Sequence, residues 1–224
     1  MTRNRRDFLR ISAALTAAGM SPSLFAATKE QFTIYGAPAM PSVTIAVAAA
    51  QGKLAKQADV ALEIWRSPDQ LRAGVASGQF KVMMSPSNVG VNLRNQGQQV
   101  GMVNILTNGI TQLMCKSTPI TSPQELVGKK ILVPFKNDMP DIVLQALLKK
   151  LNIDINKVEI TYAATPTEAI GLFLLKDFHA AILPEPMASA VVQKAKIVGT
   201  EIVRGFDLVK EWGQAFNTKP LIPM

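Results

Sequence analysis

The chain has 224 residues, a net charge of +8 at pH 7, one cysteine and one histidine. A single cysteine excludes an intramolecular disulfide, and a single histidine leaves metal sites and Ser–His or Cys–His catalytic pairs short of side chains. The basic residues are scattered among acidic ones, whereas a nucleic-acid surface requires them to cluster. We therefore expect no catalytic residues, no metal, no cofactor and no nucleic-acid partner.

Residues 1–27 have the pattern of an export signal. Thr2–Arg10 is positively charged, Ile11–Met20 is apolar, and small residues lead to Ala26-Ala27, where we expect cleavage. The apolar run is about half of the ~20 residues that span a bilayer, so it predicts a cleaved signal peptide and not a membrane helix. Arg5-Arg6 resembles a twin-arginine signal, with an ordinary secretory signal as the alternative. No cysteine follows the apolar run, which argues against a lipid anchor.

After the signal, strand patterns alternate with helical patterns. The predicted strands are Phe32–Gly36, Val60–Trp65, Val82–Ser85, Val100–Leu106, Thr111–Lys116, Lys130–Val133, Val158–Tyr162, Ala180–Leu183 and Ile197–Val203. The predicted helices are Pro41–Gln51, Ser67–Ser77, Pro86–Gln96, Pro140–Leu151, Thr165–Leu175, Glu185–Lys194 and Phe206–Ala215. Such alternation predicts an α/β fold with mainly parallel sheets flanked by helices.

A break in the alternation comes at Lys116–Gly128, which holds two prolines and a polar cluster. We therefore predict two lobes, the first over residues 28–117 and the second over residues 118–215. Residues 216–224 would begin a return to the first lobe. A cleft between two lobes is a preferred place for a small ligand.

The clearest candidate for a ligand loop is FKVMMSPSNVG at residues 80–90. A strand pattern stops at Ser85, and a helical pattern begins near Asn88. In open α/β sheets, ligands bind at the carboxyl ends of the strands, where the N–H groups of helix N-termini are free. The sequence therefore predicts a small-molecule site at such strand ends.

The order of the segments resembles a known family. They are APAMP at 37–41, MSPSNVG at 84–90, SPQELVGKKILVPFKNDMPDIVLQALLKK at 122–150, TPTEA at 165–169 and AAILPEPMAS at 180–189. This order resembles the periplasmic substrate-binding proteins of ABC importers, in the type II group that serves thiamine precursors, alkanesulfonates, taurine and nitrate. The resemblance covers about residues 31–216.

The resemblance implies a two-lobed type II periplasmic-binding-protein-like fold. It further implies a solute captured between the lobes, an ABC permease in the inner membrane as partner, a periplasmic location and a monomer. Members of the family usually continue well beyond the length of this sequence. The first lobe is therefore expected to be incomplete and the protein truncated at its C-terminus, with a compact short variant as the alternative.

The resemblance also implies ligand loops at 37–41, 85–88, 107–108, 135–141 and 184–187, all of which follow predicted strands. The candidate ligand contacts are Pro38, Met40, Ser85, Asn88, Thr107, Asn108, Phe135, Asp138, Met139, Glu185 and Met187. We predict that Phe135 stacks on a ring, which favours a thiamine-precursor-like heterocycle over a sulfonate, taurine or nitrate.

Most of these candidates have a structural alternative. Ser85 and Asn88 also suit a helix cap, and Asp138 and Asp141 suit the helix N-terminus at Pro140. Glu185 suits the first turn of a helix. The three methionines are expected to form either an adaptable apolar wall or ordinary core. Trp65 is expected at the cleft or in the core.

The leading functional hypothesis is the solute-binding component of an ABC importer. A ligand-sensing module that a membrane receptor detects and a non-functional fragment of a binding protein are the alternatives. A related eukaryotic branch makes a thiamine pyrimidine with its own histidine and iron. Its cysteine-rich motif is missing here and His179 is the sole histidine, so an enzyme is not expected.

Overall fold

The computed structural model describes residues 30–222, and the predicted signal peptide lies outside the described residues. The strands are β1 (Glu30–Gly36), β2 (Ala58–Ile64), β3 (Val82–Met83), β4 (Thr111–Lys116), β5 (Lys130–Pro134), β6 (Glu159–Ala163), β7 (Ala180–Pro184) and β8 (Ile202–Arg204). The α-helices are α2 (Pro41–Gln51), α3 (Lys53–Gln57), α4 (Pro68–Ala76), α5 (Ser87–Asn95), α6 (Met139–Lys150), α7 (Pro166–Leu175), α8 (Met187–Ile197) and α9 (Leu208–Phe216). Two 3₁₀ helices are η1 (Pro123–Leu126) and η2 (Ile155–Lys157).

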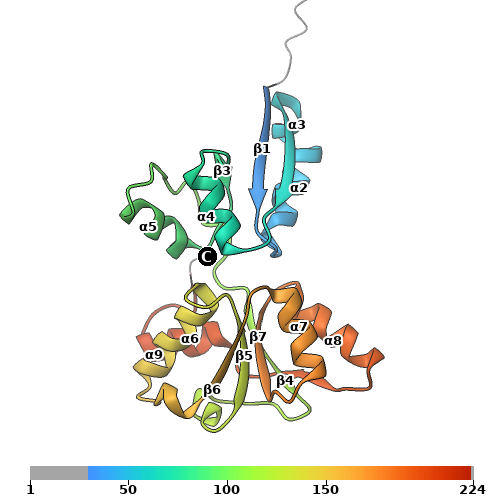
Figure 1. The fold of residues 1–224 in the computed structure, drawn as a ribbon, viewed down its shortest axis with the longest axis vertical. Helices are drawn as coiled ribbons and strands as arrows, with labels where there is room; N and C mark the ends of the chain where they lie inside the picture. Colours follow the sequence, from blue (N-terminus) through green and yellow to red (C-terminus); the bar gives the residue numbers. More distant parts are fainter. Residues whose placement is uncertain (1–29, 223–224) are drawn as a thin grey trace, which may run out of the picture. The chain divides into compact units, whose positions relative to one another are not determined.

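The strands form two sheets, one with the order β2-β1-β3 and one with the order β6-β5-β7-β4-β8 (Figure 1). The pairs β1–β3, β5–β6 and β5–β7 are parallel, and β4 runs antiparallel to both β7 and β8. The predicted α/β fold with mainly parallel sheets is therefore confirmed. No helix among residues 30–222 is both long enough and apolar enough to cross a bilayer.

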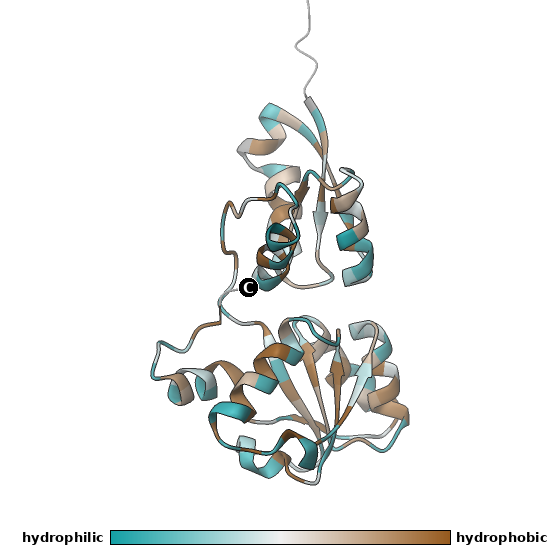
Figure 2. Ribbon diagram, turned by 60° about the vertical axis from the view of Figure 1, so that its left-hand side comes forward, coloured by the Kyte–Doolittle hydropathy of each residue, from teal (hydrophilic) through white to brown (hydrophobic). Residues whose placement is uncertain are grey.

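The larger sheet is buried on both faces because its strands alternate between two cores. In β5, Ile131 and Val133 contribute to one core and Leu132 to the other. Helices α6 and α9 cover the first core, and α7 and α8 cover the second (Figure 1). The strands are accordingly hydrophobic along most of their length (Figure 2), as expected of strands covered on both sides.

Helix starts follow from local capping. Ser67 accepts a hydrogen bond from the N–H of Gln70, and Thr165 accepts one from the N–H of Glu168. A proline stands at the first position of each of these helices, where its missing N–H costs nothing. The starts of α4 and α7 that the sequence pattern predicts therefore lie within one residue of those in the structure.

The smaller sheet has a core on the side of α4 and α5. Tyr35 stacks on Phe80 with ring centroids 3.6 Å apart, and Gly74 makes room for that ring, because a Cβ there would lie 2.5 Å from it. The opposite helix α2 is poorly covered, with Val43 and Val47 each more than half exposed.

Two predicted strands differ from the structure. Val100–Leu106 forms no strand, and Val103 is fully exposed, because among residues 30–222 no strand pairs with this segment. Backbone groups that lack a ladder partner stay in irregular, solvated structure. The predicted Ile197–Val203 strand shortens to β8, because Ile197 ends α8.

The position of β4 also differs from the predicted lobe boundary. The prediction ended the first lobe at residue 117 and so included Thr111–Lys116. In the structure this strand lies inside the larger sheet, where Thr111 pairs with Pro184 and Lys116 pairs with Ile202. The polar segment after β4 predicts a boundary, but it is only a connection within the larger sheet.

Candidate functional site

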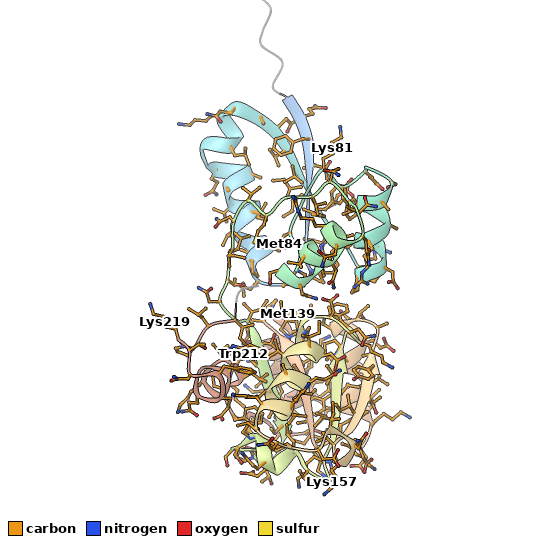
Figure 3. The ribbon with its side chains drawn as sticks, turned by 90° about the vertical axis from the view of Figure 1, so that its left-hand side faces the viewer. Lys81, Met84, Met139, Lys157, Trp212 and Lys219 are labelled. Carbon is orange, nitrogen blue, oxygen red and sulfur yellow. The ribbon has the colours of Figure 1, made fainter. Side chains whose placement is uncertain are left out.

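The candidate site lies at the carboxyl ends of β5 and β7, where α6 and α8 begin. Both strands run in the same direction, so the loops 135–138 and 184–187 come to the same edge of the larger sheet. Met139 marks this edge in Figure 3, and Lys157 marks the opposite end of the same sheet. This is the edge at which open α/β sheets bind ligands.

The loop after β5 has an unusual backbone. Phe135 and Asn137 both have φ of 60°, a left-handed conformation that costs a bulky residue such as Phe roughly 1–2 kcal/mol. The loop is held by hydrogen bonds from the Phe135 N–H to Ala163 (3.0 Å) and from the Asn137 N–H to the Asp141 carboxylate (2.8 Å). The surrounding structure therefore fixes the loop in one shape.

Asp141 is the main support of this loop. It is fully buried, and it also accepts hydrogen bonds from the Gln145 amide (2.8 Å) and the Tyr162 hydroxyl (3.0 Å). Burial and the Asp141 carboxylate together raise the pKa of Tyr162 to about 12, because both disfavour the phenolate. All these contacts are within the larger sheet and its connections, so they agree with a structural role for Asp141 near the start of α6.

Asp138 connects the two sheets. As the N-cap of α6, its Oδ1 accepts from the Met139 N–H at 2.9 Å. The same carboxylate accepts from the Asn88 amide at 3.1 Å and from the Arg72 guanidinium at 3.4 Å. Asn88 lies in α5 and Arg72 in α4, both beside the smaller sheet. The structure therefore brings two predicted residues together and adds Arg72, which the sequence did not single out.

The Asn88 side chain does not cap helix α5. Pro86 is the N-cap of α5, and it offers no side-chain hydrogen bond to the helix. The Asn88 amide nitrogen donates to Asp138, while its Oδ1 is buried and has no hydrogen-bond partner among the described residues. Ser85 lies nearby in the sequence and is half-buried. Asn88 therefore presents a free acceptor at the candidate site.

Thr111 is a second buried polar group that the sequence did not indicate. Its side chain is 7% exposed, and its Oγ1 has no hydrogen-bond partner within residues 30–222. It stands opposite Pro184, which places it at the carboxyl end of β7. A threonine in a strand is so common that the pattern alone does not distinguish it.

Glu185 is engaged within the larger sheet and its helices. Its carboxylate accepts from Arg204 at 2.7 Å and from the N–H of Ser189 at 3.1 Å. Burial opposes ionisation of Glu185, but these hydrogen bonds outweigh burial and lower its pKa. Its backbone carbonyl accepts from the Met40 N–H at 3.0 Å, so the starts of α2 and α8 meet here.

The three candidate methionines have different surroundings. Met139 is buried in the core under α6, Met187 packs against the core on the opposite face of the sheet, and Met40 is 45% exposed. Pro38 is half-buried beside Met40. Thr107 and Asn108 lie in the irregular segment before β4, where the Asn108 carbonyl accepts from the Ile222 N–H. Ligand contact by these residues stays a prediction.

Two aromatic residues also link the sheets. Trp65 is a core residue, 3% exposed, and its indole N–H donates to the Met84 carbonyl at 2.9 Å. The Phe135 ring is half-buried against the same core, with its centroid 6.4 Å from that of Trp65. One face of Phe135 is therefore occupied by protein.

His179 and Cys115 lie away from this edge. The His179 Nδ1 accepts from the Lys130 N–H at 3.0 Å, at the beginning of β5, and Cys115 is fully buried, which raises its pKa. Residues 30–222 contain no group of three His, Cys, Asp or Glu side chains arranged to hold a metal ion.

Two α/β sheets with loops at the carboxyl ends of their parallel strands match a periplasmic-binding-protein-like fold. The chain belongs to the NMT1/THI5-like family, whose model matches residues 40–182. A search of the curated proteins gave no match.

Solved structures share the fold. An ABC transporter protein from Parabacteroides distasonis is 19% identical with a TM-score of 0.62, over 81% of this chain and 59% of that one. The periplasmic aliphatic sulphonate binding protein SsuA from Escherichia coli is 14% identical with a TM-score of 0.61, over 85% and 68%. The alkanesulfonate-binding protein SsuA from Xanthomonas axonopodis pv. citri, bound to MOPS, is 17% identical with a TM-score of 0.58, over 86% and 71%. This chain thus spans 59% of the first of these structures.

Proposed function

We propose that this protein acts as the periplasmic solute-binding component of an ABC importer, capturing a small organic solute between two lobes. The observation that carries the proposal is the meeting of Asn88 and Arg72, beside the smaller sheet, with Asp138 at the carboxyl edge of the larger sheet. Side chains from two α/β units that converge at strand ends suit a clamp that closes on a solute. The names of the similar structures, which describe transport and binding proteins, support this proposal.

The proposal includes a lobe division and a location. Because β4 belongs to the larger sheet, we place the crossing between the lobes in residues 96–110, before β4. The charged and apolar pattern of residues 1–27 supports export to the periplasm, where a permease in the inner membrane would be the partner.

The free polar atoms favour a solute that donates hydrogen bonds. The Asn88 Oδ1 is an acceptor and the Thr111 hydroxyl can accept, and both are buried without a partner among the described residues. The negative charge of Asp138 is already paired with Arg72, so it offers little to a cationic solute. A flat heterocycle with N–H groups, such as a thiamine precursor, matches these acceptors better than nitrate or a sulfonate, which only accept.

The test is thermal unfolding of residues 28–224 with added aminopyrimidines, thiamine, taurine, alkanesulfonates or nitrate. A solute at about 100 times its dissociation constant stabilises the folded state by about 2.7 kcal/mol, which raises the Tm of a protein of this size by about 5–10 °C. We expect an aminopyrimidine to raise the Tm and Asn88→Ala to abolish the rise. Asn92→Ala, an exposed asparagine on the same helix, serves as the control. A cooperative transition that none of these compounds moves would contradict the proposal.

A further inference from the structure

We infer that Asp138 is the centre of a polar latch that joins the two lobes before any solute binds, and that Arg72 is the positioning residue that holds it. The inference deepens the proposed function, because the latch would set both the closed fraction of the empty protein and the direction of the Asn88 amide at the solute site. The latch consists of Arg72, Asn88 and Asp138.

The burial of Asp138 is the first argument. Its side chain is 3% exposed, and an ionised carboxylate in such a place is tolerated only where donors surround it. The Met139 N–H belongs to its own helix, whereas Asn88 and Arg72 come from helices 50 and 66 residues earlier in the sequence. Separation of the lobes would leave Asp138 with one of these three donors.

The second argument is the asymmetry of the Arg72 contacts. Arg72 also pairs with Asp69 at 3.3 Å, but Asp69 is 95% exposed and lies on the same helix. An exposed pair of this kind contributes little to stability, while the contact with Asp138 is partly buried and spans the two sheets. The favourable part of the Arg72 interaction is therefore available only while the lobes are joined.

The third argument concerns the orientation of Asn88. Its amide nitrogen donates to Asp138, so its oxygen must point elsewhere, and that oxygen is the buried atom without a partner among the described residues. The carboxylate thereby decides which end of the amide the solute meets. Without Asp138 as an acceptor, the amide could rotate by half a turn and present its N–H₂ group instead.

Two further contacts act in the same direction. The Met40 N–H donates to the Glu185 carbonyl across the sheets, and Phe135 packs against the core that contains Trp65. These contacts are a backbone hydrogen bond and an apolar contact that also cross between the sheets, so separation of the lobes would break them together with the latch. The apparent affinity for a solute is proportional to the closed fraction, so the contact between Arg72 and Asp138 would raise affinity without itself touching the solute.

The test measures the distance between spin labels in the protein without solute. Lys81 and Lys157 are exposed, one in each lobe, and cysteines introduced there can be labelled while Cys115 is buried. We expect a single narrow distribution of distances for the parent protein. Asp138→Asn keeps an N-cap, because Asn caps as well as Asp, yet it removes the charge. We expect it to shift most molecules out of this distribution, and Arg72→Gln to do the same.

Asp69→Asn is the matched control, because it removes the charge of the other carboxylate that pairs with Arg72, which lies outside the latch. Combining Arg72→Gln with Asp138→Asn should add little to either change alone, because both break one interaction. The inference is overturned if Asp138→Asn and Arg72→Gln leave the parent distances unchanged, or if Asp69→Asn shifts them equally. Distances that shift as expected while no solute raises the Tm would support the latch and contradict the proposed solute binding, so the two failures are distinguishable.

Discussion

At the scale of single residues, the neighbouring carboxylates of Asp138 and Asp141 make different contacts. Asp141 is fully buried and accepts from Asn137, Gln145 and Tyr162, all on the larger sheet or its connections. Asp138, three residues earlier, accepts from Asn88 and Arg72 across the two sheets. Asp141 therefore shapes the loop after β5, while Asp138 connects that loop to α4 and α5 beside the smaller sheet.

The coupling of Asp141 to Tyr162 predicts a measurable titration. The sequence has two tyrosines, so a Tyr35→Phe background isolates Tyr162, whose phenolate absorbance should appear near pH 12. Asp141→Asn should lower this pKa without returning it to 10, because burial remains. Since the pKa is raised on folding, its contribution to stability is complete below pH 10 and is lost as pH rises towards 12. A Tyr162 pKa that Asp141→Asn leaves unchanged would contradict the assignment.

Prediction from sequence succeeded for residues with a local role and failed for those with a distant partner. Asp138 ahead of Pro140 has the pattern of an N-cap, and the structure confirms it. Arg72, three residues after Asp69, resembles an ordinary surface pair on a helix, and nothing in the pattern reveals its contact with Asp138. Thr111 is hidden in the same way, because the surroundings of its hydroxyl depend on neighbours far away in the sequence.

At the scale of elements, helix starts are set by short-range chemistry. In α7 the Thr165 hydroxyl accepts from the Glu168 N–H at 3.1 Å, and the Glu168 carboxylate accepts from the Ala164 N–H at 2.8 Å. These reciprocal bonds satisfy donors that a helix start otherwise leaves free. Strands lack such local instructions, which explains why the predicted strand at Val100–Leu106 fails while all seven predicted helices are found; the short helix α3 (Lys53–Gln57) was not predicted.

The cap of α7 predicts the effect of one substitution. Thr165→Ala should lower the free energy of unfolding by about 1 kcal/mol, the usual contribution of such a cap. Thr167→Ala, at an exposed position two residues later, should change it much less. Chemical denaturation of both variants checks this, and equal effects would mean that the Thr165 hydroxyl does not stabilise the helix.

At the scale of the whole molecule, the larger sheet and its helices form one continuous stretch of sequence. Every strand from β4 to β8 lies between residues 111 and 204, and α9 completes the core that contains Leu113 and Leu208. The smaller sheet contributes no strand to it. A division of the chain at residue 117 would therefore separate β4 from the sheet to which it belongs.

This difference predicts the behaviour of two fragments. Residues 108–222 produced alone should unfold in one cooperative transition, because they retain all five strands of the larger sheet. Residues 118–222 should not, because β7 and β8 lose the strand that joins them. Circular dichroism during thermal unfolding distinguishes the two, and equal behaviour would argue against our lobe division.

The location of β4 has a consequence for synthesis of the protein. Both of its partners come later in the sequence, and Met114 pairs with Arg204, about 90 residues on, so the sheet has a high contact order. At roughly 5–20 residues per second, the ribosome needs on the order of ten seconds to supply the last partner. The apolar Leu113–Cys115 stretch has no ladder to join until β7 is synthesised, and one of its edges stays unpaired until β8 follows.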